Sequence, residues 1–170
     1  MQSPPCPAVA INALPEFLPM FDILIFLFES YFDAGSYPES DRLSAKLSAA
    51  GFEEDDIHLA LSWLSGLREL SAATYPERIN RSGLRCYTDF ENERISEDGL
   101  RFIAFWEHNK IISPIEREMI IDRVVALGRN KLALDKVKLI ALMVLWNQHD
   151  DLDPLLIEDL LTPSDATQVH

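Results

Sequence analysis

Residues 135–146 constrain the fold more than any other segment, because they are apolar on every side of a helix. After Asp135, one face carries Val137, Ile140, Ala141, Val144 and Leu145, and the other carries Leu139, Leu142, Met143 and Trp146. A helix that is hydrophobic all round lies inside a protein, covered by other elements. The sequence therefore predicts a central core helix with the rest of the chain packed around it.

The remaining apolar residues also recur with a helical period, which predicts an all-α fold. Two helical subdomains are expected, at residues 20–70 and 96–161. The clearest helix start is Ser113-Pro114-Ile115-Glu116, with an N-cap serine, a proline at the first helical position and a glutamate at the third. Ser96 and Asp153-Pro154 mark two further helix starts.

Residues 71–95 are expected to form an irregular connector, because the helical period is lost there. Short alternating stretches at 78–80 and 84–88 flank Arg81-Ser82-Gly83. Two strands joined by that turn would make a hairpin, and the N-terminal subdomain would then resemble a winged helix. The alternation is brief, so a connector without a hairpin stays open as the alternative.

The two ends of the chain differ from the helical pattern. Residues 1–19 hold five of the ten prolines and neither Lys nor Arg, which argues against a helix and against a signal peptide. We expect a disordered leader, with a misplaced start and Met20 as the true first residue as the alternative. The polar residues 162–170 predict a disordered tail.

Charge and composition exclude several classes of protein. The formal net charge of −13 opposes attraction to nucleic acid or anionic lipid unless a local basic patch overrides it. No apolar run is long enough to cross a bilayer, so no membrane partner is expected. The two cysteines, Cys6 and Cys86, cannot form a disulfide scaffold or a four-ligand zinc site. A reduced, cytoplasmic protein is the simplest interpretation.

Residues that could carry out chemistry do not occur in a recognisable catalytic pattern. The chain has no glycine-rich phosphate loop, no His-Glu-x-x-His motif and no nucleophile elbow. His149 with Asp150, Asp151 and Asp153 comes nearest to a metal site, but it lacks the ligand spacing of a calcium loop. A solvated loop that caps a helix is favoured. We therefore expect no enzymatic activity, no cofactor and no metal.

Cys86 and the three tryptophans can each be explained without a chemical or ligand-binding role. Cys86 beside Arg85 could be a reactive thiol, although a buried, inert cysteine is favoured. Trp63, Trp106 and Trp146 each sit within an apolar helical run, which predicts core anchors rather than a stacking platform for a ligand.

Residues 39–64 have the pattern of a helix-turn-helix, with Gly51 in the turn. In a DNA-binding unit the start of the second helix meets base edges between phosphates. Here that start reads Glu53-Glu54-Asp55-Asp56, and four carboxylates would repel the phosphate backbone. A winged helix used for protein contacts and a plain three-helix packing unit both remain open.

Basic residues gather in two other places. Arg117 and Arg123 belong to a basic stretch at 110–138, and Arg78, Arg81 and Arg85 lie in the connector. They could bind an acidic partner or RNA, or they could neutralise the acidic half of the same molecule, which is favoured. Together with Glu53, Glu54, Asp55 and Asp56, these five arginines form the candidate interaction surface.

Several short motifs occur in an order that resembles one known family. They are Met20-Phe21-Asp22-Ile23-Leu24, Ala50-Gly51-Phe52, Trp63-Leu64, Tyr87-Thr88, the run at 117–127, and Leu142-Met143-Val144-Leu145. This pattern, over about residues 20–147, is similar to the Smg family of bacterial proteins. The resemblance implies a bacterial cytosolic protein, often encoded near a DNA-processing protein, and it supplies no catalytic or binding residues to transfer.

Two functions follow as expectations. The first is a non-enzymatic interaction or adaptor protein that binds another protein through its acidic N-terminal half and the helix at 155–161. The alternative is a nucleic-acid-associated factor, in a DNA-processing or recombination context, that uses the basic residues at 110–138.

Overall fold

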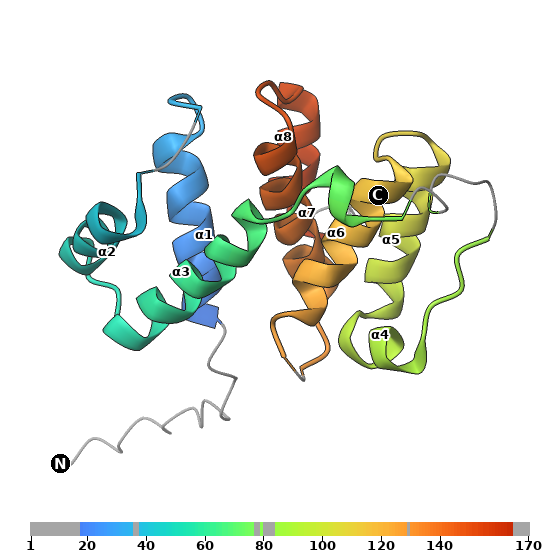
Figure 1. Ribbon diagram of the computed structural model, residues 1–170, viewed down its shortest axis with the longest axis horizontal. Helices are drawn as coiled ribbons and strands as arrows, with labels where there is room; N and C mark the ends of the chain where they lie inside the picture. The colour runs from blue at the N-terminus through green and yellow to red at the C-terminus, as the bar shows by residue number, and fades with distance from the viewer. Residues whose placement is uncertain (1–17, 36–37, 77–78, 80–83, 129, 165–170) are drawn as a thin grey trace, which may run out of the picture.

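The computed structural model describes residues 18–35, 38–76, 79, 84–128 and 130–164, and these residues form an all-α fold (Figure 1). The elements are α1 (Leu18–Tyr31), α2 (Ser40–Ala49), α3 (Glu54–Arg68), the 3-10 turn η1 (Ala72–Thr74), α4 (Asp89–Arg94), α5 (Glu97–His108), α6 (Pro114–Val125), α7 (Leu134–Gln148) and α8 (Pro154–Leu161). No strand occurs in these described ranges. The predicted all-α fold is confirmed.

Helix α7 runs through the centre of the molecule. Its residues 139–146 are all buried, and α1, α3, α5, α6 and α8 pack against it. Figure 1 shows α1, α2 and α3 on one side of α7, and α4 and α5 on the other. The buried side chains of both sides form one hydrophobic cluster. The predicted core helix is therefore confirmed, and residues 20–70 and 96–161 share a core through it.

Side-chain caps begin α5, α6 and α8 at the residues that the sequence predicts. Ser113 and Glu116 form a capping box at the start of α6, with Pro114 at its first position. The Ser96 hydroxyl accepts a hydrogen bond from the Gly99 amide at 3.1 Å. The Asp153 carboxylate accepts one from the Leu155 amide at 2.8 Å, so the favoured helix-capping interpretation holds for Asp153.

The turn between α2 and α3 is fixed by Gly51, whose φ of +97° lies in the left-handed region. The amides of Gly51 and Phe52 donate to the carbonyls of Ser48 and Leu47 at 3.0 and 3.2 Å, which closes the end of α2. The Phe52 ring then packs edge-on against Phe26 of α1, with ring centroids 5.7 Å apart. This contact links the start of α3 to α1, and the two helices pack against each other.

The connector is described only in part, so the hairpin at 78–88 stays a prediction. Residues 84–88 are extended but pair with no strand in the described part of the chain, and Arg78, Asn80 and Arg81-Ser82-Gly83 lie outside it. Thr88 and Glu91 form a capping box that starts α4, a helix that the sequence analysis missed. A helix of six residues is too short to show an apolar period, so only this cap could have revealed it.

The ends of the described chain are tied to the core. Helix α1 begins at Leu18, within the predicted leader, because a proline such as Pro19 is tolerated in a first helical turn. At the other end, the Ser164 amide donates to the Asp135 carboxylate at 2.9 Å. Ser164 is therefore held against α7 within the predicted tail, whereas residues 165–170 lie outside the described residues.

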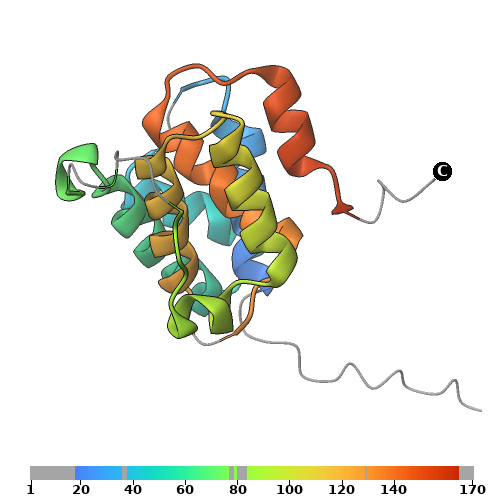
Figure 2. The same ribbon diagram turned by 90° about the vertical axis from the view of Figure 1, so that its right-hand side faces the viewer.

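Helix α8 is the last described helix and follows α7. It packs mainly on α7, and Figure 2 shows it at the edge of the molecule. The Lys138 ammonium donates to the Asp159 carbonyl at 3.1 Å, near the end of α8, where the helix dipole favours a cation. None of the described helices is both long and apolar enough to cross a membrane.

Candidate functional site

The start of α3 carries the four acidic residues of the predicted surface. Glu53 is the N-cap residue, and Glu54, Asp55 and Asp56 follow in the first turn. Glu53, Glu54 and Asp55 are exposed, whereas Asp56 is half-buried. No Lys or Arg of the described ranges forms an ion pair with them. Their contact with a partner stays a prediction.

One helical turn further along α3, the surface is hollowed into a pocket. Its volume is about 200 Å³, and it is lined by Met20, Leu59, Ser62, Trp63, Arg123, Ala126 and Leu127. These residues come from the start of α1, the middle of α3 and the end of α6. Leu59 is 41% exposed, although such a side chain would gain free energy from burial. Asp55 and Asp56 precede Leu59 by four and three residues, so they lie on its side of the helix.

Arg123 links α6 to α3 beside this pocket. Its backbone carbonyl accepts a hydrogen bond from the Trp63 indole nitrogen at 3.0 Å, and its Nη1 lies 3.5 Å from the Trp63 carbonyl. Its Nε is buried and has no hydrogen-bond partner in the described part of the chain. Arg123 was predicted on an exposed surface, but its side chain is half-buried between two helices.

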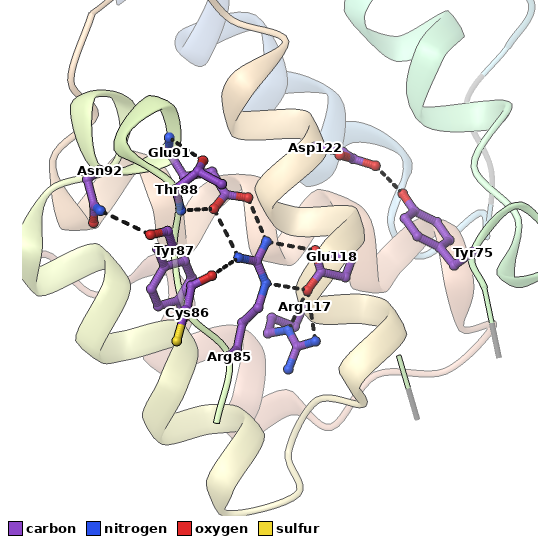
Figure 3. Close-up of polar contacts among 10 residues, drawn as sticks. All are labelled: Tyr75, Arg85, Cys86, Tyr87, Thr88, Glu91, Asn92, Arg117, Glu118 and Asp122. Atoms are coloured by element: carbon purple, nitrogen blue, oxygen red, sulfur yellow. Dashed lines mark hydrogen bonds and ion pairs between the residues drawn. The ribbon is translucent and has the colours of Figure 1, made fainter. Parts of the chain in front are cut away.

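Arg85 forms the centre of a second polar cluster, between the connector and α6 (Figure 3). Its Nε and Nη2 donate to the two carboxylate oxygens of Glu118 at 2.9 and 3.0 Å. Its Nη1 and Nη2 donate to Glu91 at 3.0 and 2.6 Å. One guanidinium therefore holds two carboxylates in bidentate pairs, the strongest geometry for such contacts.

Arg117 extends the same cluster toward α5. It is 5% exposed, and its guanidinium donates to Glu118 at 2.8 Å and also pairs with Glu107. Glu118 thus bridges two arginines. Arg85 and Arg117 were named in the candidate interaction surface, and they neutralise carboxylates of their own chain, as the favoured interpretation expected. Those carboxylates belong to α4, α5 and α6, and not to the acidic start of α3.

The electrostatics of this cluster favour its charged state. Burial alone would raise the pKa of Glu118, but the hydrogen bonds and charges of Arg85 and Arg117 outweigh burial and hold that pKa below its ordinary value. The pKa of Glu91 is lowered against burial in the same way by Arg85 and Thr88. Next to the cluster, Tyr75 donates to Asp122 at 2.5 Å, and burial together with this hydrogen bond raises the Tyr75 pKa. The Arg85–Glu118 ion pair and the Tyr75–Asp122 hydrogen bond hold the connector against α6.

The other basic residues do not gather into an open patch in the described ranges. Lys136 lies over the Phe21 ring, 4.7 Å from its centroid, and Lys138 binds carbonyls at the end of α8. Lys110 and Lys131 are exposed. Arg78, Arg81 and Arg129 lie outside the described residues.

Cys86 and His149 were the candidates for a reactive thiol and for a metal ligand. Cys86 is exposed, so the favoured interpretation as a buried cysteine was wrong, and Arg85 contacts its carbonyl oxygen at 2.5 Å. The imidazole of His149 pairs with Glu116, away from the neighbouring aspartates. Groups of three or more potential metal ligands do not occur within the described residues.

Comparisons with known proteins identify the family. The model of a family described as "Protein of unknown function (DUF494)" matches residues 20–170. A protein Smg homolog of Azoarcus sp. strain BH72 is 45% identical over 147 residues, which cover 86% of this chain and 95% of that protein. The chain belongs to the Smg family.

Other Smg homologs match along nearly the same length. The homolog of Nitrosomonas europaea is 41% identical over 152 residues, which cover 89% of this chain and 100% of its own. That of Methylobacillus flagellatus is 36% identical over 151 residues, with the same coverage. No solved structure matches the chain. The matching family is described as one of unknown function.

Proposed function

We propose that the protein is a non-enzymatic adaptor that binds another protein through the α3 face, defined here as Glu53, Glu54, Asp55 and Asp56 with the adjoining pocket at Leu59 and Trp63. The observation that carries the proposal is the pocket itself. It combines an exposed leucine with a half-buried arginine whose Nε lacks a hydrogen-bond partner in the described part of the chain. Concave apolar surfaces with a few polar groups are typical of binding sites.

The charged residues of the second polar cluster pair with one another, which supports a binding function over a catalytic one. Arg85, Arg117, Glu91, Glu107 and Glu118 are paired with one another and hold the connector, α4, α5 and α6 together. The polar side chains that line the pocket are Ser62 and Arg123, and a serine nucleophile would need a neighbouring general base. We therefore assign the clustered charges to the stability of the fold and the pocket to recognition.

The helix-turn-helix predicted for residues 39–64, which hold α2 and α3, fits this role if its second helix meets a protein. Carboxylates at the start of α3 would repel phosphate but would attract basic residues of a protein partner. The nucleic-acid alternative would need a basic patch, and Arg117, Arg123, Lys136 and Lys138 make contacts inside the molecule instead. We propose that the adaptor acts in the bacterial cytoplasm.

Site-specific photo-cross-linking in the native bacterium tests this function. The cross-linking amino acid p-benzoylphenylalanine replaces Leu59 in one strain and Phe105 in a control strain. Both side chains are exposed, but Phe105 lies on α5, outside the pocket. We expect a discrete protein adduct from position 59 and none of the same mass from position 105. An adduct with nucleic acid, or no adduct specific to position 59, would contradict the proposal.

A further inference from the structure

We propose that the pocket between α1, α3 and α6 receives the C-terminal residue of a partner polypeptide, with its apolar side chain in the pocket and its free carboxylate on Arg123. This inference rests on the proposed adaptor function, because it names the part of the partner that the α3 face binds. Nothing in the names of the relatives points to such a site.

The size and walls of the pocket select one apolar side chain. Its volume of about 200 Å³ is below the roughly 300–1,000 Å³ of typical small-molecule sites. Met20, Leu59, Trp63 and Leu127 are the large apolar residues of its lining. Leu59 is partly exposed, so an inserted side chain would cover apolar surface that is now in contact with water.

Arg123 adds a positive charge to the pocket lining, and a purely apolar ligand would not need this charge. Its Nε is buried without a partner, and its Nη2 makes no hydrogen bond to any described residue. No carboxylate in the described ranges forms an ion pair with this guanidinium. In the same molecule, Arg85 and Arg117 each hold two carboxylates. A partly desolvated cation without a counter-ion is unfavourable, and a bound carboxylate would remove that penalty.

A single C-terminal residue supplies both the apolar group and the carboxylate. Arg123 is part of the pocket lining, and the pocket has room for one large side chain. An internal apolar residue of a partner carries no charge at that position, whereas a C-terminal leucine or phenylalanine carries its α-carboxylate beside its side chain. A C-terminal residue therefore provides an apolar side chain for the pocket lining and a carboxylate for Arg123.

The test uses two peptides and the full-length protein labelled with ¹⁵N. The probes are acetyl-Gly-Ser-Gly-Phe with a free C-terminal carboxylate and the same peptide as its amide. The reporter is the indole N–H cross-peak of Trp63, assigned with Trp63→Phe, because this group bonds to the Arg123 carbonyl beside the pocket. We expect saturable shifts with the free acid and at least about tenfold weaker binding of the amide, since a charge-assisted hydrogen bond to Nη2 of Arg123 is lost.

Two variants assign the effect to Arg123. Arg123→Gln should abolish the preference for the free acid, and Arg101→Gln, which removes an exposed arginine of α5, should leave it intact. If Arg123→Gln fails to fold, Gly66→Ala provides the same test, because a Cβ at Gly66 displaces the guanidinium without removing it. Equal binding of acid and amide, no shift at millimolar peptide, or an unchanged preference in Arg123→Gln would overturn the inference.

The outcomes separate this inference from the proposed function. A negative peptide titration together with a protein cross-link from position 59 would overturn the C-terminal ligand and leave the adaptor in place. Failure of the cross-link would count against the adaptor whatever the peptides do.

Discussion

The guanidinium of Arg123 lies across α3 at Gly66, where a Cβ atom added to the glycine would stand 2.2 Å from Nη1. A glycine inside a helix usually weakens it by about 1 kcal/mol relative to alanine. Here the missing side chain makes room for an arginine from another helix. The pair Gly66 and Arg123 thus sets how closely α6 approaches α3 beside the pocket.

Gly66→Ala should move the arginine while the fold survives. The clashing atom is the far end of a flexible side chain, and the gain in helix propensity offsets part of the strain, so we expect the free energy of unfolding to change by no more than about 1 kcal/mol. The Trp63 indole cross-peak should shift, because Trp63 bonds to Arg123. Urea unfolding and a ¹⁵N correlation spectrum measure both effects. Ser65→Ala, on the next residue, is the control, and an unchanged Trp63 signal in Gly66→Ala would refute this account.

Arg117→Met should destabilise the protein more than any loss of an exposed ion pair. Arg117 is buried between Glu107 and Glu118, whose side chains are 24% and 16% exposed, so its removal leaves two carboxylates short of a partner. We expect a loss of about 2–4 kcal/mol in the free energy of unfolding, below the value for fully buried pairs because both acids are partly solvated. The control Arg101→Met breaks an exposed pair and should cost less than about 1 kcal/mol. Similar losses in chemical denaturation of the two variants would contradict a structural role for Arg117.

Acid should weaken the fold through the same cluster. The pKa values of Glu91 and Glu118 lie below the ordinary 4.5 in the folded protein, so the folded state binds fewer protons than the unfolded state in this range. The stability that these groups contribute is complete above their unfolded pKa and is lost as the pH falls through their folded pKa. The free energy of unfolding, measured from pH 7 down to pH 3, should therefore fall most steeply below about pH 4.5.

Glu118→Gln should flatten that acid slope, because glutamine does not titrate. Glu97→Gln serves as the control, since Glu97 is 78% exposed and pairs only with exposed Arg101 among the described residues. An acid slope that Glu118→Gln leaves unchanged would show that other groups control acid unfolding.

Lys138→Met should loosen α8 without unfolding the rest. The lysine bonds to carbonyls of Asp159 and Thr162, which end α8 or follow it, and α8 packs mainly on α7. Amide hydrogen exchange within α8 should accelerate about threefold to tenfold, equivalent to roughly 0.6–1.4 kcal/mol, while α7 keeps its protection. Lys131→Met, which removes an exposed lysine, is the control. Unchanged exchange in α8 would show that its apolar residues hold it alone.

Local signals in the sequence predicted much of the fold. The apolar run at 139–146 predicts a buried helix because no side of it can face water, and α7 is that helix. Ser96, Ser113 and Gly51 act within a few residues of themselves, so their capping roles could be read directly. Trp63, Trp106 and Trp146 are buried, as their apolar neighbours predicted.

The candidate site depends on contacts between distant residues and was harder to predict. Arg117 pairs with Glu107 across a helix boundary, and Arg85 meets Glu118, which is 33 residues away. Ion pairs leave no periodic pattern in the sequence. The sequence therefore does not distinguish an exposed arginine from a buried one. Gly66 carried a usable signal for Arg123, because a glycine in the middle of a helix calls for an explanation by packing.

The recognition role of the α3 face can be tested most directly by repeating the cross-linking at position 59 in a strain that also carries Arg123→Gln. The measurement is the fraction of the protein found in the discrete adduct, compared with the strain that keeps Arg123. If Arg123 holds the partner's carboxylate, this fraction should fall at least about fivefold at equal expression, as the loss of a charge-assisted contact implies. An equal fraction in both strains would contradict a site built around Arg123, and the absence of any adduct at position 59 would contradict the adaptor.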